Sequence, residues 1–193
     1  MTDSGSTEEG TVSSPGIGMR LCIAGISAKF PSVPNISTAD LAQLMKNSSG
    51  QSADSGKLVI LDTRPEEEYS ISRIPGATRV DYTDEVNNIL EAVPQLASID
   101  SETKVVCYCS VGYRSSLVAD KLNKFFENSG AAPTQPKVTN LEGSLFKWAN
   151  ENRPLVDEKG ERTVYAHPYN AVYGKLLNSE LRKSFHDNKD AKM

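Results

Sequence analysis

The chain has 193 residues, of which 38% are hydrophobic and 24% charged, and its net charge is −4. These values are ordinary for a globular domain, and the length is sufficient to bury a core. No basic run indicates binding to nucleic acid or to an anionic membrane. No apolar stretch approaches the roughly 20 residues that span a bilayer. The three cysteines, Cys22, Cys107 and Cys109, are too few for a disulfide framework and indicate a reducing compartment.

Residues 1–30 are predicted to be a disordered N-terminal segment, because their beginning is rich in serine, glycine and threonine. Three acidic residues precede Arg20, the first basic residue, which is typical neither of a secretory signal nor of a transit peptide. We therefore expect a cytoplasmic protein. A mitochondrial location is expected only if translation starts at Met19.

Residues 33–156 alternate between apolar runs of strand length and stretches with helical spacing. The run "KLVILD" at 57–62 is continuously apolar up to its final carboxylate, as is typical of a strand buried on both faces. In "PEEEY", at 65–69, proline and acidic residues indicate a helix start. The order of elements predicts an α/β domain with a mainly parallel sheet. The expected helices lie at 37–47, from 65, at 114–130 and at 144–152, and the expected strands at 57–62, 79–81, 104–109 and 137–141.

Residues 157–193 are predicted to be a C-terminal extension. Within it, the apolar spacing over 170–185 predicts an amphipathic helix, although Gly174 is unfavourable there. His167 precedes this helix and would approach a catalytic site only if the extension folds back over the domain.

The stretch "CSVGYRS", residues 109–115, has the chemistry of an activated thiol. Cys109 ends a strand, and in open α/β sheets ligands bind at the carboxyl ends of strands. The backbone N–H groups of the loop, the start of the following helix and the charge of Arg114 all stabilise a thiolate, so the pKa of Cys109 should fall below its usual value. Gly112 suits a tight bend, and Val111 and Tyr113 are expected to form the walls of a pocket.

The size of this loop separates two kinds of chemistry. Four residues lie between Cys109 and Arg114, one fewer than in cysteine-dependent phosphatases and related arsenate reductases. A tighter loop fits a single extra sulfur atom better than a tetrahedral oxyanion, which favours a cysteine persulfide over a phosphocysteine.

Three stretches in order resemble the signatures of the single-domain rhodanese-like (thiosulfate sulfurtransferase-like) family. They are "LDTRPEEEYSISRIPGA", "CSVGYRS" and "VTNLEGSLFKWANENRPL", and the similarity covers about residues 36–156. The resemblance implies an open, mainly parallel five-stranded sheet flanked by helices.

The resemblance also implies sulfurtransferase activity. Cys109 would take a sulfane sulfur from a donor such as thiosulfate, and a thiol, a protein thiol or cyanide would accept it from the persulfide. Arg114 would orient the anionic donor, and the loop residues would bind the substrate: Ser110, Val111, Gly112, Tyr113 and Ser115. No metal, organic cofactor, nucleic acid or membrane is implied.

Two positions depart from the family pattern. Ser72-Arg73 stands where members usually have Gly-His, and Gly143-Ser144 where they commonly have Gly-Gly. Neither pair is expected to touch the nucleophile, although Arg73 is a candidate for the pocket rim. Asp62 and Arg64 are expected to form a structural ion pair. The loop also lacks the extra basic residues of some efficient thiosulfate users, which leaves the donor open.

The remaining cysteines have simpler interpretations. Cys107 lies inside a strand and is expected to pack in the core, because a disulfide to Cys109 would be strained. Cys22 is expected to be inert or to resolve an oxidised Cys109. The alternative functions are a non-catalytic or redox-sensing protein-binding module and, less favoured by the loop, a phosphatase or arsenate reductase.

Overall fold

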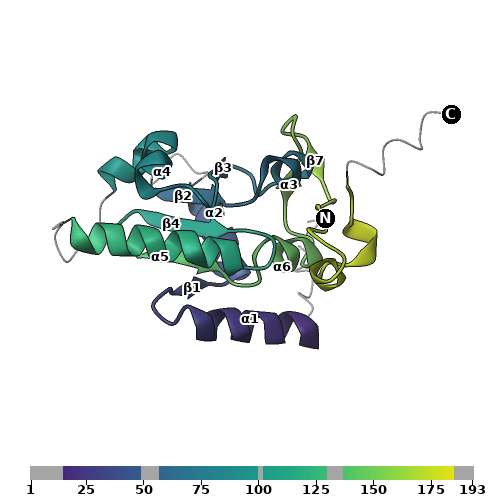
Figure 1. The fold of residues 1–193 in the computed structure, drawn as a ribbon. Coiled ribbons are helices and arrows are strands. Elements are labelled where there is room, and N and C mark those ends of the chain that lie inside the picture. Colours follow the sequence, from purple (N-terminus) through teal and green to yellow (C-terminus); the bar gives the residue numbers. More distant parts are fainter. Residues whose placement is uncertain (1–14, 49–56, 100–101, 130–136, 185–193) are drawn as a thin grey trace, which may run out of the picture.

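The computed structural model describes residues 15–48, 57–99, 102–129 and 137–184, and every structural statement below concerns these residues. Their centre is a five-stranded parallel sheet with the strand order β1-β5-β4-β2-β3 (Figure 1). The strands are β1 (Asn35–Ile36), β2 (Leu58–Asp62), β3 (Thr78–Arg79), β4 (Lys104–Tyr108) and β5 (Val138–Leu141). The predicted fold, an α/β domain with an open five-stranded parallel sheet, is confirmed.

Helices cover both faces of this sheet, which explains why its central strands are almost continuously apolar. Val106 and Tyr108 of β4 belong to the core that contains side chains of α2 (Thr38–Ser48) and α6 (Ser144–Asn150). Val105 and Cys107 face the opposite core, formed with α4 (Val86–Ala92) and α5 (Tyr113–Asn128). Because the carboxyl ends of β2 and β4 meet in register at Asp62 and Tyr108, the segments that follow both strands emerge at one edge.

The segment after β2 turns at Pro65 into α3 (Glu66–Ile71). The segment after β4 turns directly into α5, which begins at Tyr113, one residue earlier than predicted. At the start of α2 the backbone N–H of Asp40 donates to Ser37 Oγ, which caps the helix. Residues 86–98 form α4 and a short 3-10 helix, for which the sequence carried no prediction.

The predicted disorder of residues 1–30 is wrong for Ile17–Lys29, which form the helix α1. This helix is stabilised by packing, because Met19 is buried in the core and Ile23 and Ile26 pack against it. It runs beside the edge strand β1 (Figure 1), and the side chain of Asn35 donates to Ser27 Oγ at 3.1 Å. The serine- and glycine-rich residues 1–14, which gave rise to the prediction, lie outside the described residues.

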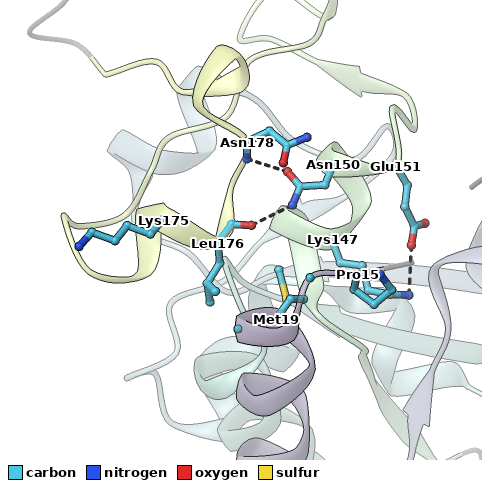
Figure 2. Close-up of a pocket in the computed structure, with 10 residues that line it drawn as sticks. Pro15, Met19, Lys147, Asn150, Glu151, Lys175, Leu176 and Asn178 are labelled. Carbon is cyan, nitrogen blue, oxygen red and sulfur yellow. Dashed lines mark hydrogen bonds and ion pairs between the residues drawn. The ribbon is translucent and has the colours of Figure 1, made fainter. Parts of the chain in front are cut away.

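The predicted amphipathic helix at 170–185 is also wrong. After a hairpin of β6 (Leu155–Val156) and β7 (Arg162–Thr163), the extension as far as residue 184 forms two 3-10 turns in place of a helix, Tyr173–Leu176 and Ser179–Leu181. Side chains compete with helical hydrogen bonding here. Asn170 Oδ1 accepts from two backbone N–H groups, and the amide of Asn150 on α6 bridges the backbone of Leu176 and Asn178 (Figure 2).

The N-terminal helix α1 and the C-terminal extension contact each other as well as the domain. The pocket in Figure 2 is lined by the start of α1, by α6 and by the C-terminal extension. A Cβ placed on Gly18 would lie 3.1 Å from Leu176 Cδ2, so the missing side chain of Gly18 allows the two segments to approach closely. No helix in the described part of the chain is both long and apolar enough to cross a membrane.

Candidate active site

The loop between β4 and α5 wraps around the sulfur of Cys109. The backbone N–H of Gly112 donates to Cys109 Sγ at 3.1 Å. Gly112 has a φ of 117°, a conformation that side chains rarely tolerate, so glycine is what allows this N–H to point back at the sulfur. The thiol itself is almost completely buried, with 1% of the residue exposed.

Arg114, in the first turn of α5, is fixed by a buried network. Its guanidinium donates to both carboxylate oxygens of Glu68 on α3, at 2.8 and 3.0 Å, and to Ser110 Oγ at 2.9 Å. Ser110 Oγ in turn donates to Glu68 Oε2. This bidentate geometry orients the cation beside the loop while compensating part of its charge.

Opposing effects set the pKa of Cys109. Burial acts to raise it, but the charge of Arg114 and the backbone N–H groups of Ser115 and Gly112 act to lower it. The net result is a pKa below the ordinary value of a cysteine thiol. These surroundings are of the kind that stabilise a thiolate, unlike the purely apolar surroundings of a core cysteine.

Cys109 lies at an open cavity of about 450 Å³. Besides Cys109, the loop supplies Ser110, Val111, Tyr113 and Arg114 to the cavity lining. The other lining residues come from α1 and from the C-terminal extension. From α1 come Leu21, Cys22, Gly25, Ile26 and Lys29, and from the C-terminal extension come Tyr169 and Tyr173. The cavity therefore has mainly apolar walls, built largely by segments outside the central sheet.

Tyr169 places the C-terminal extension directly over the loop. Its ring lies 4.7 Å from the guanidinium carbon of Arg114, within the range of a cation–π interaction. Its φ of 63° is uncommon for a tyrosine, and such backbone outliers concentrate at functional sites.

The remaining predicted site residues fall into different places. Ser115 is buried below the loop, and its hydroxyl donates to Asn140 Oδ1 at 2.7 Å. Arg73, predicted as a pocket rim, is not among the residues that line the Cys109 cavity. Instead its backbone pairs with Val156 of β6, and its guanidinium carbon lies 4.7 Å from the centre of the Tyr69 ring.

Asp62 and Arg64 form a fully buried ion pair. Arg64 Nε donates to Asp62 Oδ1 at 2.9 Å, and the same guanidinium donates to the backbone carbonyls of Glu68 and Ser72. The pair therefore ties the end of β2 to α3 and fixes the helix that carries Glu68. This arrangement fits the scaffold role expected from the sequence.

Three residues make contacts with the site that the sequence did not predict: Glu68, Ser144 and Tyr169. Glu68 is the only buried residue of the three consecutive glutamates, and no role was assigned to it. Ser144 has a φ of 50°, and its hydroxyl accepts a hydrogen bond from the backbone N–H of Cys109 at 3.2 Å. The expectation that Gly143-Ser144 lies away from the nucleophile is therefore wrong. Tyr169 had no local signal, because its position depends on how the extension folds.

Two other candidates from the sequence have clear surroundings. Cys107 is fully buried in the core facing α5, and burial and then the charge of Cys109 raise its pKa. The extension does fold back, but His167 is not part of the cavity lining, and its Nδ1 accepts from the Tyr169 backbone N–H. Burial is the main effect that lowers the pKa of His167.

All three cysteines are free thiols. Within residues 15–48, 57–99, 102–129 and 137–184, no group of three or more His, Cys, Asp or Glu side chains could hold a metal ion.

Comparison with known proteins identifies a curated relative of this chain. The chain is 28% identical over 134 residues to the adenylyltransferase and sulfurtransferase uba4 of Pyricularia oryzae, a match that covers 64% of this chain and 26% of the relative. The chain thus spans about a quarter of the length of this curated relative.

The fold is shared with a solved structure. A thiosulfate sulfurtransferase from Pseudomonas aeruginosa superposes with a TM-score of 0.50 at 21% identity, covering 74% of this chain and 23% of that one. The BH2092 protein from Bacillus halodurans has a TM-score of 0.47 at 19% identity, covering 71% and 86%. The family model of the rhodanese-like domain matches residues 39–151, more than half of the sequence. The chain therefore belongs to the rhodanese-like domain family.

Proposed function

We propose that the chain is a sulfurtransferase that moves a sulfane sulfur from a donor such as thiosulfate to a thiol or cyanide acceptor through a persulfide on Cys109. The observation that carries this proposal is the environment of the thiol: Gly112 N–H lies 3.1 Å from Cys109 Sγ, and Arg114 lowers the pKa of the thiol despite burial. Membership of a family with sulfurtransferases among its members supports it.

In the first step the Cys109 thiolate attacks the outer sulfur of thiosulfate. A new S–S bond forms at Cys109 Sγ, the S–S bond of the donor breaks, and sulfite leaves with the electron pair. Arg114 orients the anionic donor from one side. Because Glu68 accepts two of its hydrogen bonds, the guanidinium is fixed before the donor arrives and need not be ordered during the reaction.

In the second step an acceptor thiolate or cyanide attacks the outer sulfur of the persulfide. The bond to Cys109 breaks, and Cys109 leaves as a thiolate. The N–H groups of Gly112 and Ser115 and the charge of Arg114 stabilise the charge on this sulfur in both steps. The mainly apolar cavity walls limit water at the sulfur and strengthen these interactions. These steps use protein groups alone.

Mass spectrometry of the intact chain after incubation with thiosulfate tests this proposal. We expect an added mass of about 32 Da, the mass of one sulfur atom, which cyanide then removes as thiocyanate. The variant Cys109→Ser should show neither the adduct nor thiocyanate formation. If no sulfane sulfur donor leaves an adduct, the chain acts as a binding or redox-sensing module instead. Hydrolysis of an aryl phosphate that depends on Cys109 would indicate phosphatase chemistry.

A further inference from the structure

A second thiol lines the cavity of Cys109. Cys22 lies on α1, four residues before Ile26 and seven before Lys29, and this spacing places all three on one face of the helix. All three residues line the cavity. The cavity therefore has one free cysteine, Cys109, on the side of the central domain and another, Cys22, on the side of α1.

The face of α1 that carries Cys22 is held against the active-site loop. A Cβ placed on Gly112 would lie 3.5 Å from Ile26 Cδ1, so Ile26 packs beside the residue whose N–H binds Cys109 Sγ. At the end of α1, the ring of Phe30 packs against Tyr113 with 5.4 Å between centroids. Cys22, one helical turn before Ile26, is thereby fixed next to the loop.

The electrostatics agree that the two thiols are neighbours. Burial, and then the negative charge of Cys109, raise the pKa of Cys22. The pKa of Cys109 is shifted in the opposite direction. Of the two thiols, Cys109 therefore loses its proton more readily and is the one expected to react first with a donor.

We propose that Cys22 is a second sulfur carrier, which takes the sulfane sulfur from the Cys109 persulfide inside the cavity and holds it closer to solvent. This proposal rests on the proposed persulfide chemistry. Cys109 is 1% exposed, whereas Cys22 is only half-buried, so a sulfur on Cys22 is easier for an external acceptor to reach.

The geometry favours transfer of the sulfur over formation of a disulfide. In a Cys109 persulfide, the inner sulfur stays enclosed by the loop, and only the outer sulfur extends into the cavity. Cys22 therefore attacks the outer sulfur after losing its proton to solvent. A bond forms between Cys22 Sγ and that sulfur, the bond to Cys109 Sγ breaks, and Cys109 leaves as a thiolate. No oxidant or reductant is consumed, and the lowered pKa of Cys109 makes it a good leaving group.

Peptide mass spectrometry follows the sulfur directly. The full chain is incubated with thiosulfate, quenched with iodoacetamide at successive times and digested with trypsin. Cys22 is found in the peptide Leu21–Lys29, and Cys109 shares the peptide Val105–Arg114 with Cys107, so fragmentation assigns the modified cysteine. We expect a sulfane sulfur on Cys109 first and on Cys22 later.

Three variants separate the relay from its alternatives. In Cys22→Ser, the sulfur should stay on Cys109 and its transfer to an acceptor thiol should slow. In Cys22→Ser combined with Ala24→Cys, the thiol moves to an exposed part of α1 outside the cavity lining and should not restore transfer. In Cys109→Ser, Cys22 should remain unmodified.

The outcomes distinguish the two proposals. Sulfur that loads on Cys109 but never reaches Cys22 overturns the relay and leaves the sulfurtransferase intact. Sulfur on Cys22 in Cys109→Ser also overturns the relay, because Cys22 would then react with the donor by itself. If neither cysteine carries sulfur with any donor, the proposed function itself fails.

Discussion

Arg114 and Glu68 form a buried two-point ion pair next to the sulfur of Cys109. The guanidinium donates to both carboxylate oxygens, at 2.8 and 3.0 Å, and its charge also lowers the pKa of the thiol. The guanidinium of Arg114 thus interacts with two groups from different elements, the carboxylate of Glu68 on α3 and the sulfur of Cys109 directly after β4. The balance between these two interactions determines how reactive the thiol is, and each partner can be changed separately.

Replacing Arg114 by methionine should raise the pKa of Cys109. Burial already acts to raise it, and the opposing charge would be gone. The thiolate would then form only at higher pH, so the pH midpoint of alkylation by iodoacetamide should move up and the rate at neutral pH should fall. Arg114→Lys should shift the midpoint less, because it keeps the charge but loses the two-point geometry.

The stability of the Arg114→Met variant provides its control. Glu68 would be left buried without its partner, which costs about 3–5 kcal/mol of the free energy of unfolding. Adding Glu68→Gln should recover part of this loss without restoring the pKa. If the pH midpoint of alkylation is unchanged both in Arg114→Met and in the double variant, Arg114 does not stabilise the thiolate.

Replacing Glu68 by glutamine should have the opposite effect on the thiol. The charge of Arg114 would no longer be shared with a carboxylate, so the pKa of Cys109 should fall further and the alkylation midpoint should move to lower pH. The loss of charged hydrogen bonds should cost about 1.5–3 kcal/mol, measured by denaturant unfolding. Glu67→Gln, at the exposed neighbouring position, should change neither quantity.

Much of this site follows from local sequence patterns. The continuous apolar run of β2 indicates a strand buried on both faces, and four residues between Cys109 and Arg114 indicate a tight loop around a sulfur. Both patterns are local, because the residues that form each strand, or the turn after it, are neighbours in the sequence. The ion pair of Asp62 with Arg64 is local in the same way, because the two residues are only two positions apart.

The residues that complete the site depend on tertiary packing. Glu68 differs from Glu66 and Glu67 only in its direction on α3, which is set by the Arg64 hydrogen bonds to that helix. Cys22 and Tyr169 reach the cavity only because α1 and the C-terminal extension fold onto the domain. No periodicity within either segment shows where it docks.

Gly112 and Gly25 offer a matched pair of glycine substitutions. Gly112→Ala should cost about 1–3 kcal/mol of the free energy of unfolding, because an alanine would be forced to a φ of 117°. It should also slow persulfide formation as the N–H moves away from Cys109. Gly25 lies inside α1, where an added Cβ meets nothing within 4 Å, so Gly25→Ala should stabilise by about 0.5–1 kcal/mol. Equal changes in both unfolding midpoints would contradict the strained geometry of the loop.

Ser144 should respond differently to glycine and to alanine. Both substitutions remove the hydroxyl that accepts from the buried Cys109 N–H, at a cost of about 1–3 kcal/mol. Only glycine also relieves the φ of 50°, so Ser144→Gly should be the more stable variant in denaturant unfolding. If alanine is tolerated as well as glycine, the strained backbone at this position has no energetic consequence.

Tyr169 should control which molecules reach Cys109, because its ring lines the cavity and lies over Arg114. Tyr169→Ala would open the cavity on the side of the C-terminal extension. Alkylation of Cys109 by a bulky aromatic iodoacetamide should then become faster, while alkylation by iodoacetamide itself should change little. Tyr165→Ala is the matched control, since that ring is similarly exposed but lies near Lys183 and not in the cavity lining. A similar gain in both variants, or none in either, would show that Tyr169 does not restrict access.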